Sequence, residues 1–131
     1  MFDSVKEIMN TNIEVISGES TVFEAIERLI DKRIRSLLVK LKKDYGIITV
    51  RDIIFKVIAK KLDPLKVKVS EIASAPVIVV GESTSVEEVL STMEKFNIAR
   101  VFVKDEKTNE VIGVVSFFDI LSYFIVKSAK S

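Results

Sequence analysis

The sequence predicts an α/β (α+β) fold made of two tandem β-α-β-β-α repeats packed as a pseudo-twofold pair. The first observation is an internal repeat: residues 5–40 align without gaps on residues 69–104 at an offset of 64, and 9 of the 36 pairs are identical. The second is a motif that occurs as residues 46–53 and again as 113–120. A two-copy duplication predicts a globular pair rather than a solenoid, which needs three or more repeats.

The elements of the first copy follow from apolar periodicity and from turn residues. We expect a short helix at 3–9, a strand at 13–16, a helix at 22–32, strands at 36–40 and 45–48, and a helix from 49 to about 61. Thr21, followed three residues later by Glu24, is the capping pattern that predicts the start of the second of these helices. Pro64 falls just beyond the last helix, where proline cannot continue it.

The second copy repeats this order, and its capping pattern recurs as Ser85 with Glu88. Its hairpin turn, Asp105 to Glu110, is three residues longer, so the two motifs align at an offset of 67. We therefore expect repeat 1 at 1–62, a linker at 63–68 and repeat 2 at 69–131. A repeat of this size is marginal as a lone core and should pack against its twin.

Composition excludes several classes of function. The chain has no cysteine and no histidine, which excludes disulfides, a thiolate nucleophile, a Ser-His-Asp triad and thiolate or imidazole zinc sites. No acidic cluster suggests a hard-metal site, so we expect no catalytic residues and no metal. A net charge of +1 argues against nucleic acid as the main partner, although a local basic face remains open at Lys40, Lys42, Lys43, Lys60 and Lys61.

Localisation is expected to be cytoplasmic. Asp3, Lys6 and Glu7 follow Met1 too closely for a secretory signal. The most apolar run, 111–126, is too short to cross a bilayer, so no membrane association is expected.

The repeated motif reads glycine, two aliphatics, a hydroxyl residue, two variable positions, aspartate and isoleucine. It predicts a buried strand that runs directly into a helix whose first turn carries Thr49 and Asp52 in one copy and Ser116 and Asp119 in the other. Unpaired N–H groups at such a helix start can bind phosphate, and the aspartate can accept hydrogen bonds from sugar hydroxyls. The alternative is that these residues only cap the helix.

The last helix of each copy carries an apolar stripe two residues wide at each turn. Its members are Ile53, Ile54, Val57 and Ile58 in the first copy and Ile120, Leu121, Phe124 and Ile125 in the second. Such stripes are compatible with a thick intramolecular core or with a subunit interface, and their width favours the interface.

Two tandem copies of this order, each with the motif before its last helix, resemble a pair of cystathionine-β-synthase (CBS) domains, also called a Bateman module. The resemblance covers about Val5 to Val126. It implies an adenosyl ligand, such as AMP, ADP, ATP or S-adenosylmethionine, bound in clefts between the two copies, with no required cofactor. It also implies a regulatory role rather than an enzymatic one.

The resemblance implies a set of ligand contacts. The motif aspartates, Asp52 and Asp119, would bind the ribose hydroxyls, and Thr49 and Ser116 would lie near the ribose or phosphate. The implied adenine-lining residues are Thr11, Asn12 and Ile13 in one copy and Ala75, Pro76 and Val77 in the other. The implied phosphate contacts are Arg100 in the second copy and Arg35 in the first, with Arg51 as a further candidate.

The two copies differ between the hydroxyl and the aspartate, where the first has Val50-Arg51 and the second Phe117-Phe118. The two clefts should therefore not be equivalent. Arg51 is either a phosphate contact or a solvated side chain, and Phe118 either stacks on a base or joins the subunit interface.

The leading expectation is a stand-alone regulatory module that binds an adenosyl nucleotide, acts as a homodimeric sensor and signals to an effector protein that the sequence does not identify. The alternative is a structural dimerisation module with vestigial clefts.

Overall fold

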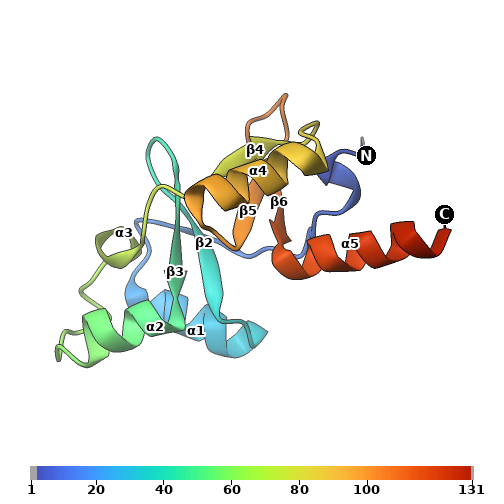
Figure 1. The fold of residues 1–131 in the computed structure, drawn as a ribbon. Coiled ribbons are helices and arrows are strands. Elements are labelled where there is room, and N and C mark those ends of the chain that lie inside the picture. The colour runs from blue at the N-terminus through green and yellow to red at the C-terminus, as the bar shows by residue number, and fades with distance from the viewer. Residues whose placement is uncertain (1–2, 131) are drawn as a thin grey trace. The chain divides into compact units, whose positions relative to one another are not determined.

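The computed structural model describes residues 3–130 (Figure 1). The chain forms two compact units, which are described separately below. One unit is Glu14–Val77, and the other combines Met1–Ile13 with Ile78–Ser131.

The unit Glu14–Val77 contains a three-stranded sheet in the order β1-β2-β3. Strand β1 (Val15–Ser17) is parallel to β2 (Ser36–Lys40), and β2 is antiparallel to β3 (Tyr45–Thr49). The remaining elements are α1 (Val22–Lys32), α2 (Val50–Ile53), η2 (Ile54–Ile58) and α3 (Val69–Ile72). The core of this unit consists of Ile16, Val22, Ala25, Leu29, Leu37, Val39, Ile48, Ile53, Val57, Val69 and Ile72.

Helix α1 begins and ends where the sequence predicts. The hydroxyl of Thr21 accepts a hydrogen bond from the N–H of Glu24 at 3.2 Å, which pairs one of the first N–H groups of the helix. Arg33 ends the helix in the left-handed conformation with φ 55°. The apolar stripe Val22, Ala25 and Leu29 is buried against the sheet core.

The helix after β3 differs from the prediction of one regular helix to about Lys61. Only α2 is α-helical; η2 is a π-helix, in which the N–H of Ala59 bonds the carbonyl of Ile54, five residues earlier. Lys61 has φ 59°, a left-handed conformation that does not continue a helix, so the helical segment stops before it.

The second unit repeats the strand and helix order. Strand β4 (Val79–Gly81) is parallel to β5 (Arg100–Lys104), and β5 is antiparallel to β6 (Val111–Ser116). Its helices are η1 (Val5–Glu7), α4 (Val86–Phe96) and α5 (Phe117–Lys130). The core residues are Val5, Val89, Met93, Val101, Val103 and Val115. The predicted α/β class with a β-α-β-β-α order in each copy is thus confirmed.

The short helix that opens each copy packs with the strands of the other copy. Figure 1 shows the N-terminal segment, in blue, beside elements in orange and red. The N–H of Asn10 donates to the carbonyl of Val114 on β6 at 2.8 Å, and the N–H of Ile47 on β3 donates to the carbonyl of Ser74 at 2.8 Å. The compact units therefore divide the chain differently from the sequence repeats. The opening helix is also shorter than the expected 3–9, because only Val5–Glu7 form a 3-10 turn.

Each motif glycine lies where the incoming segment approaches its strand closely. A Cβ at Gly46 would come within 2.8 Å of the carbonyl oxygen of Ser74, and a Cβ at Gly113 within 2.6 Å of the sulfur of Met9. The glycine at the start of each motif therefore allows a second segment to pair with the edge of β3 or β6.

We expect Gly46→Ala to destabilise the protein by about 1–3 kcal/mol, because the added methyl group meets backbone that has to move. Gly113→Ala should cost less, since the nearest atoms belong to the flexible side chain of Met9, although the carbonyl of Asn10 lies 3.1 Å from the added Cβ. Urea unfolding of both variants checks this order. A greater loss in Gly113→Ala would contradict it.

Candidate functional site

The first motif forms a closed hydrogen-bonded corner between β3 and α2, which we call the first corner and define by Thr49 and Asp52. Asp52 Oδ2 accepts from the N–H of Thr49 at 2.9 Å and from its hydroxyl at 2.9 Å. The N–H of Asp52 donates back to Thr49 Oγ1 at 3.1 Å. This reciprocal arrangement is a capping box, as the spacing predicts.

The second corner, defined by Ser116 and Asp119 between β6 and α5, has the same geometry. Asp119 Oδ2 accepts from the N–H of Ser116 at 2.8 Å and from its hydroxyl at 2.9 Å. The N–H of Asp119 donates to Ser116 Oγ at 3.4 Å. Each corner uses one carboxylate oxygen, Oδ2, for the cap, so Oδ1 is the oxygen that the cap leaves for other contacts.

The expectation of unpaired N–H groups at the helix starts is wrong for the first and third N–H of each helix. The N–H of Val50 donates to the carbonyl of Arg35 at 3.0 Å, and that of Phe117 donates to the carbonyl of Ala99 at 3.1 Å. The third N–H groups belong to the motif aspartates and are used by the caps. A phosphate would have to compete for these donors, so the corners are better suited to bind sugar hydroxyls through the carboxylates.

Lys56 distinguishes the first corner from the second. Its ammonium lies 3.0 Å from Asp52 Oδ1 and donates to the carbonyl oxygen of Ile72, the last residue of α3, also at 3.0 Å. Burial raises the pKa of Asp52, but the hydrogen bonds from Lys56 and Thr49 outweigh burial and hold this pKa below its usual value. Asp52 therefore stabilises the fold above about pH 4, and this contribution is lost as the pH falls through its lowered pKa.

In the second copy, Tyr123 occupies the position equivalent to Lys56 at the offset of 67. Its hydroxyl donates to Asp3 Oδ2, and the ammonium of Lys127 lies 2.7 Å from the same oxygen. The hydrogen bond from Lys127 lowers the pKa of Asp3, and the bond to Asp3 raises the pKa of Tyr123 to about 12. Helix α5 thus holds the N-terminal segment through Asp3, just as η2 holds α3 through Lys56.

Two of the predicted basic residues lie beside the corners. Arg100 is directly opposite Ser116 in the β5–β6 pairing, and its side chain is exposed. Arg35 is exposed and shares a backbone hydrogen bond with the first corner through Val50. Arg51 instead places its guanidinium 4.9 Å from the ring centroid of Phe55, a cation–π contact on the helix surface.

The predicted adenine-lining segments lie along the same strands as the motifs. Pro76 and Val77 belong to the unit of the first corner, where the N–H of Val77 donates to the carbonyl of Tyr45 at 3.0 Å. Thr11, Asn12 and Ile13 belong to the unit of the second corner. Val77 pairs at the start of β3, and Asn10, the residue before Thr11, pairs with Val114 on β6, whereas the corners lie at the strand ends.

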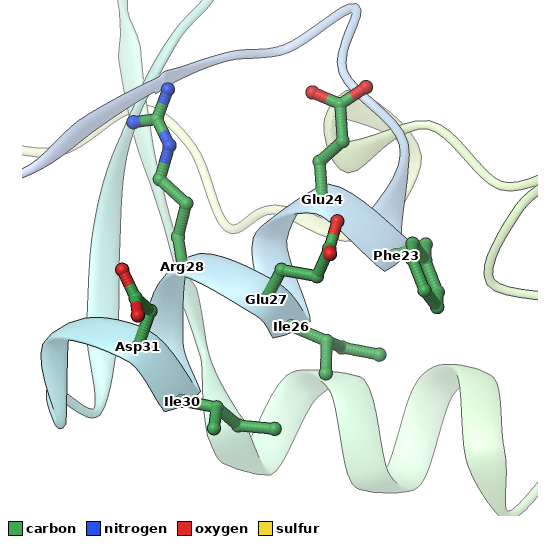
Figure 2. A pocket seen from close by; sticks show the side chains of 7 residues that line it. All are labelled: Phe23, Glu24, Ile26, Glu27, Arg28, Ile30 and Asp31. Carbon is green, nitrogen blue, oxygen red and sulfur yellow. The ribbon is translucent and has the colours of Figure 1, made fainter.

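Asp119 borders a hollow of about 270 Å³, which is also lined by Glu7, Ile8, Ser122, Tyr123 and Val126. A larger hollow of about 660 Å³ lies on α1 and contains none of the predicted site residues. Figure 2 shows that Phe23, Ile26 and Ile30 in this second hollow point to the same side of α1, whereas Glu24 and Arg28 point away from it. The α1 hollow therefore offers an apolar surface rather than a polar ligand site.

The apolar stripes on the last helices are only partly buried. In the first copy, Ile53 and Val57 lie in the core, whereas Ile54 and Ile58 are 41% and 51% exposed. On α5, Ile120 is half-buried, and the exposed members are Leu121, Phe124 and Ile125, with Phe118 exposed beside them. Two of the four stripe members are therefore exposed in the first copy and three of the four in the second.

Among residues 3–130, no group of three or more acidic side chains is arranged to hold a metal ion. No helix in the same described range is long and apolar enough to cross a membrane.

Sequence reasoning missed two side chains that shape the corners, Lys56 and Tyr123. Lys56 follows Asp52 by four residues, the spacing at which helical ion pairs form, so a local signal for it existed. Its second contact, with the carbonyl of Ile72, depends on where α3 packs and has no local signal.

The fold and the paired corners define a tandem-repeat α/β protein with a capped aspartate at each strand–helix junction. The chain belongs to the CBS domain family, whose model matches it at residues 5–59 and at 69–126. The resemblance seen in the motifs is thereby confirmed.

Curated relatives match most of this chain, but some of them are longer than it. The uncharacterized protein MK0525 of Methanopyrus kandleri is 32% identical over 120 residues, which make up 90% of this chain and 61% of the relative. The chain spans about six tenths of the length of two curated archaeal relatives that it matches.

Solved CBS proteins share the fold. The CBS domain pair of protein MJ0100, solved with 5′-methylthioadenosine and S-adenosyl-L-methionine, is 30% identical with a TM-score of 0.72, and the match covers 97% of this chain and 99% of that chain. The hexameric CBS-CP12 protein from bloom-forming cyanobacteria is 35% identical with a TM-score of 0.72, and the match covers 92% of this chain and 67% of that chain.

Proposed function

We propose that this chain is a ligand-sensing regulatory module that binds an adenosyl compound, with the ribose hydroxyls on the motif aspartates. The observation that carries the proposal is the geometry of the corners. In each, the cap fixes the carboxylate through Oδ2 and so orients Oδ1 as the acceptor for the two hydroxyls of a ribose. In the first corner, this oxygen is also paired with Lys56.

Support for the ligand class comes from the family. The CBS pair of MJ0100 matches 97% of this chain and was solved with two adenosyl compounds. AMP, ADP, ATP and S-adenosylmethionine are the candidate ligands for this chain.

The proposed assembly is a homodimer. The exposed members of the apolar stripes would form self-complementary surfaces that a second copy can cover in a twofold contact. A change in dimer geometry on ligand binding would then carry the signal to an effector protein. The hexameric relative shows that a protein with this fold can assemble.

The competing function is a structural dimerisation module whose corners are only helix caps. The completed capping boxes favour it, because they account for both aspartates without any ligand.

Thermal unfolding with a panel of nucleosides and nucleotides separates the two functions. A ligand at a hundredfold excess over its Kd stabilises the folded state by about 2.7 kcal/mol. For a protein of this size we expect an adenosyl ligand to raise the Tm by about 5 °C or more. Guanosine and cytidine compounds should give smaller shifts. If no adenosyl compound moves the transition, the dimerisation module is the correct function.

A further inference from the structure

The second oxygen of the motif aspartate has a different environment in each corner. Asp52 has both oxygens engaged, Oδ2 by Thr49 and Oδ1 by Lys56, and its side chain is only 15% exposed. The carboxylate of Asp119 has no ammonium or guanidinium group within 4 Å among the side chains that the structure describes. Asp119 borders the smaller hollow instead.

The ammonium group of Lys56 is held by two contacts. It bonds the carboxylate of Asp52 and the last carbonyl of α3, so moving it breaks two charge-assisted hydrogen bonds. Tyr123, at the equivalent position of the second copy, has its hydroxyl directed to Asp3 rather than to the motif aspartate. The difference in the ion pairing of the two motif aspartates therefore follows from one pair of equivalent positions, 56 and 123.

We propose that Lys56 determines which motif copy binds the ribose: it keeps Asp52 in an ion pair that the ligand has to displace, so Asp119 is the high-affinity ribose acceptor. This inference rests on the proposed function, because it assigns the ribose to the motif aspartates. The first corner binds weakly as long as Lys56 remains paired.

Isothermal titration calorimetry with AMP and with 5′-methylthioadenosine tests the ranking. Asp119→Asn is expected to weaken binding about tenfold or more, because it removes the charge from the hydrogen bonds to the ribose hydroxyls. Asp52→Asn should change the affinity by less than about twofold. Equal losses in the two variants would overturn the proposal while leaving the proposed function intact.

Lys56→Met tests the cause. The probe is the neutral 5′-methylthioadenosine, which has no phosphate. Loss of the lysine charge therefore does not weaken binding by removing an attraction for a phosphate. We expect the stoichiometry to rise from about one to about two ligands per chain. Lys56→Arg, which keeps the charge and the donors, should behave as the native protein, as should the control Lys60→Met, which lies in the turn just after η2. An unchanged stoichiometry in Lys56→Met would overturn the proposal.

A ligand-free measurement separates this inference from the proposed function. The carboxyl pKa of Asp52, followed by NMR titration, should rise in Lys56→Met because burial is then opposed only by Thr49. An unchanged pKa would show that the ion pair is absent in solution and would overturn the proposal whatever binds. If the pKa rises but no adenosyl probe binds any variant, the proposed function has failed, and this assignment of the ribose fails with it.

Discussion

Replacing both motif aspartates, in Asp52→Asn with Asp119→Asn, is expected to abolish adenosyl binding while the fold survives. A ribose donates two hydroxyl groups to one carboxylate, and each charge-assisted bond is worth roughly 1.5–3 kcal/mol. Losing them lowers the affinity by about a hundredfold or more. Calorimetric titration with AMP measures the loss.

The control has to separate the ligand from the cap, because both use the same carboxylates. Asp105→Asn is the matched control, since Asp105 Oδ1 accepts backbone hydrogen bonds from Lys107 at 2.7 Å and Thr108 at 3.1 Å but lies in a turn outside the motifs. Both variants should lose ligand-free stability on the order of 1 kcal/mol per cap. Only the double motif variant should lose binding. Full binding by the double variant would leave the aspartates as caps alone.

Phe124→Glu is expected to convert a homodimer into a monomer. Phe124 is 57% exposed on α5, so the substitution leaves the core of its unit intact. Burial of a phenylalanine contributes about 1.5–3 kcal/mol, and a twofold contact contains the residue twice. The dimer dissociation constant should therefore rise by about a hundredfold or more, which light scattering across a dilution series measures.

Leu65→Glu is the matched control for assembly. Leu65 is 60% exposed, like Phe124, but lies between the helical segments of its unit rather than on an apolar stripe. It should leave the molar mass unchanged. Native protein that is monomeric at tens of micromolar would refute the homodimer. A monomer produced equally by Leu65→Glu would refute the apolar stripes as its interface.

Local signals predicted the regular elements well. Helix α1 and strand β2 have the expected limits because a capping residue and a binary apolar pattern act over a few residues. The capping boxes of both corners are likewise local, and the structure confirms them. The motif could therefore be placed at two strand–helix junctions from sequence alone.

Long-range pairing could not be predicted in the same way. The contact between Ile47 and Ser74 is made by backbone groups, which every residue type has, so the sequence does not indicate it. The only sequence feature connected with the exchange of the opening helices between the copies is the glycine of each motif, Gly46 and Gly113. The role of Lys56 depends on this exchange, because the carbonyl that it bonds belongs to α3. The π-helical turn after α2 also has no signal in the apolar stripe, which continues through it.

The most direct test of the account compares AMP with 2′-deoxy-AMP on the native protein by isothermal titration calorimetry. The central claim is that a motif aspartate accepts hydrogen bonds from the ribose hydroxyls. Removing the 2′-hydroxyl deletes one charge-assisted bond and changes nothing else on the ligand, so we expect the deoxy compound to bind about tenfold or more weakly. Equal affinity for the two compounds would contradict the claim.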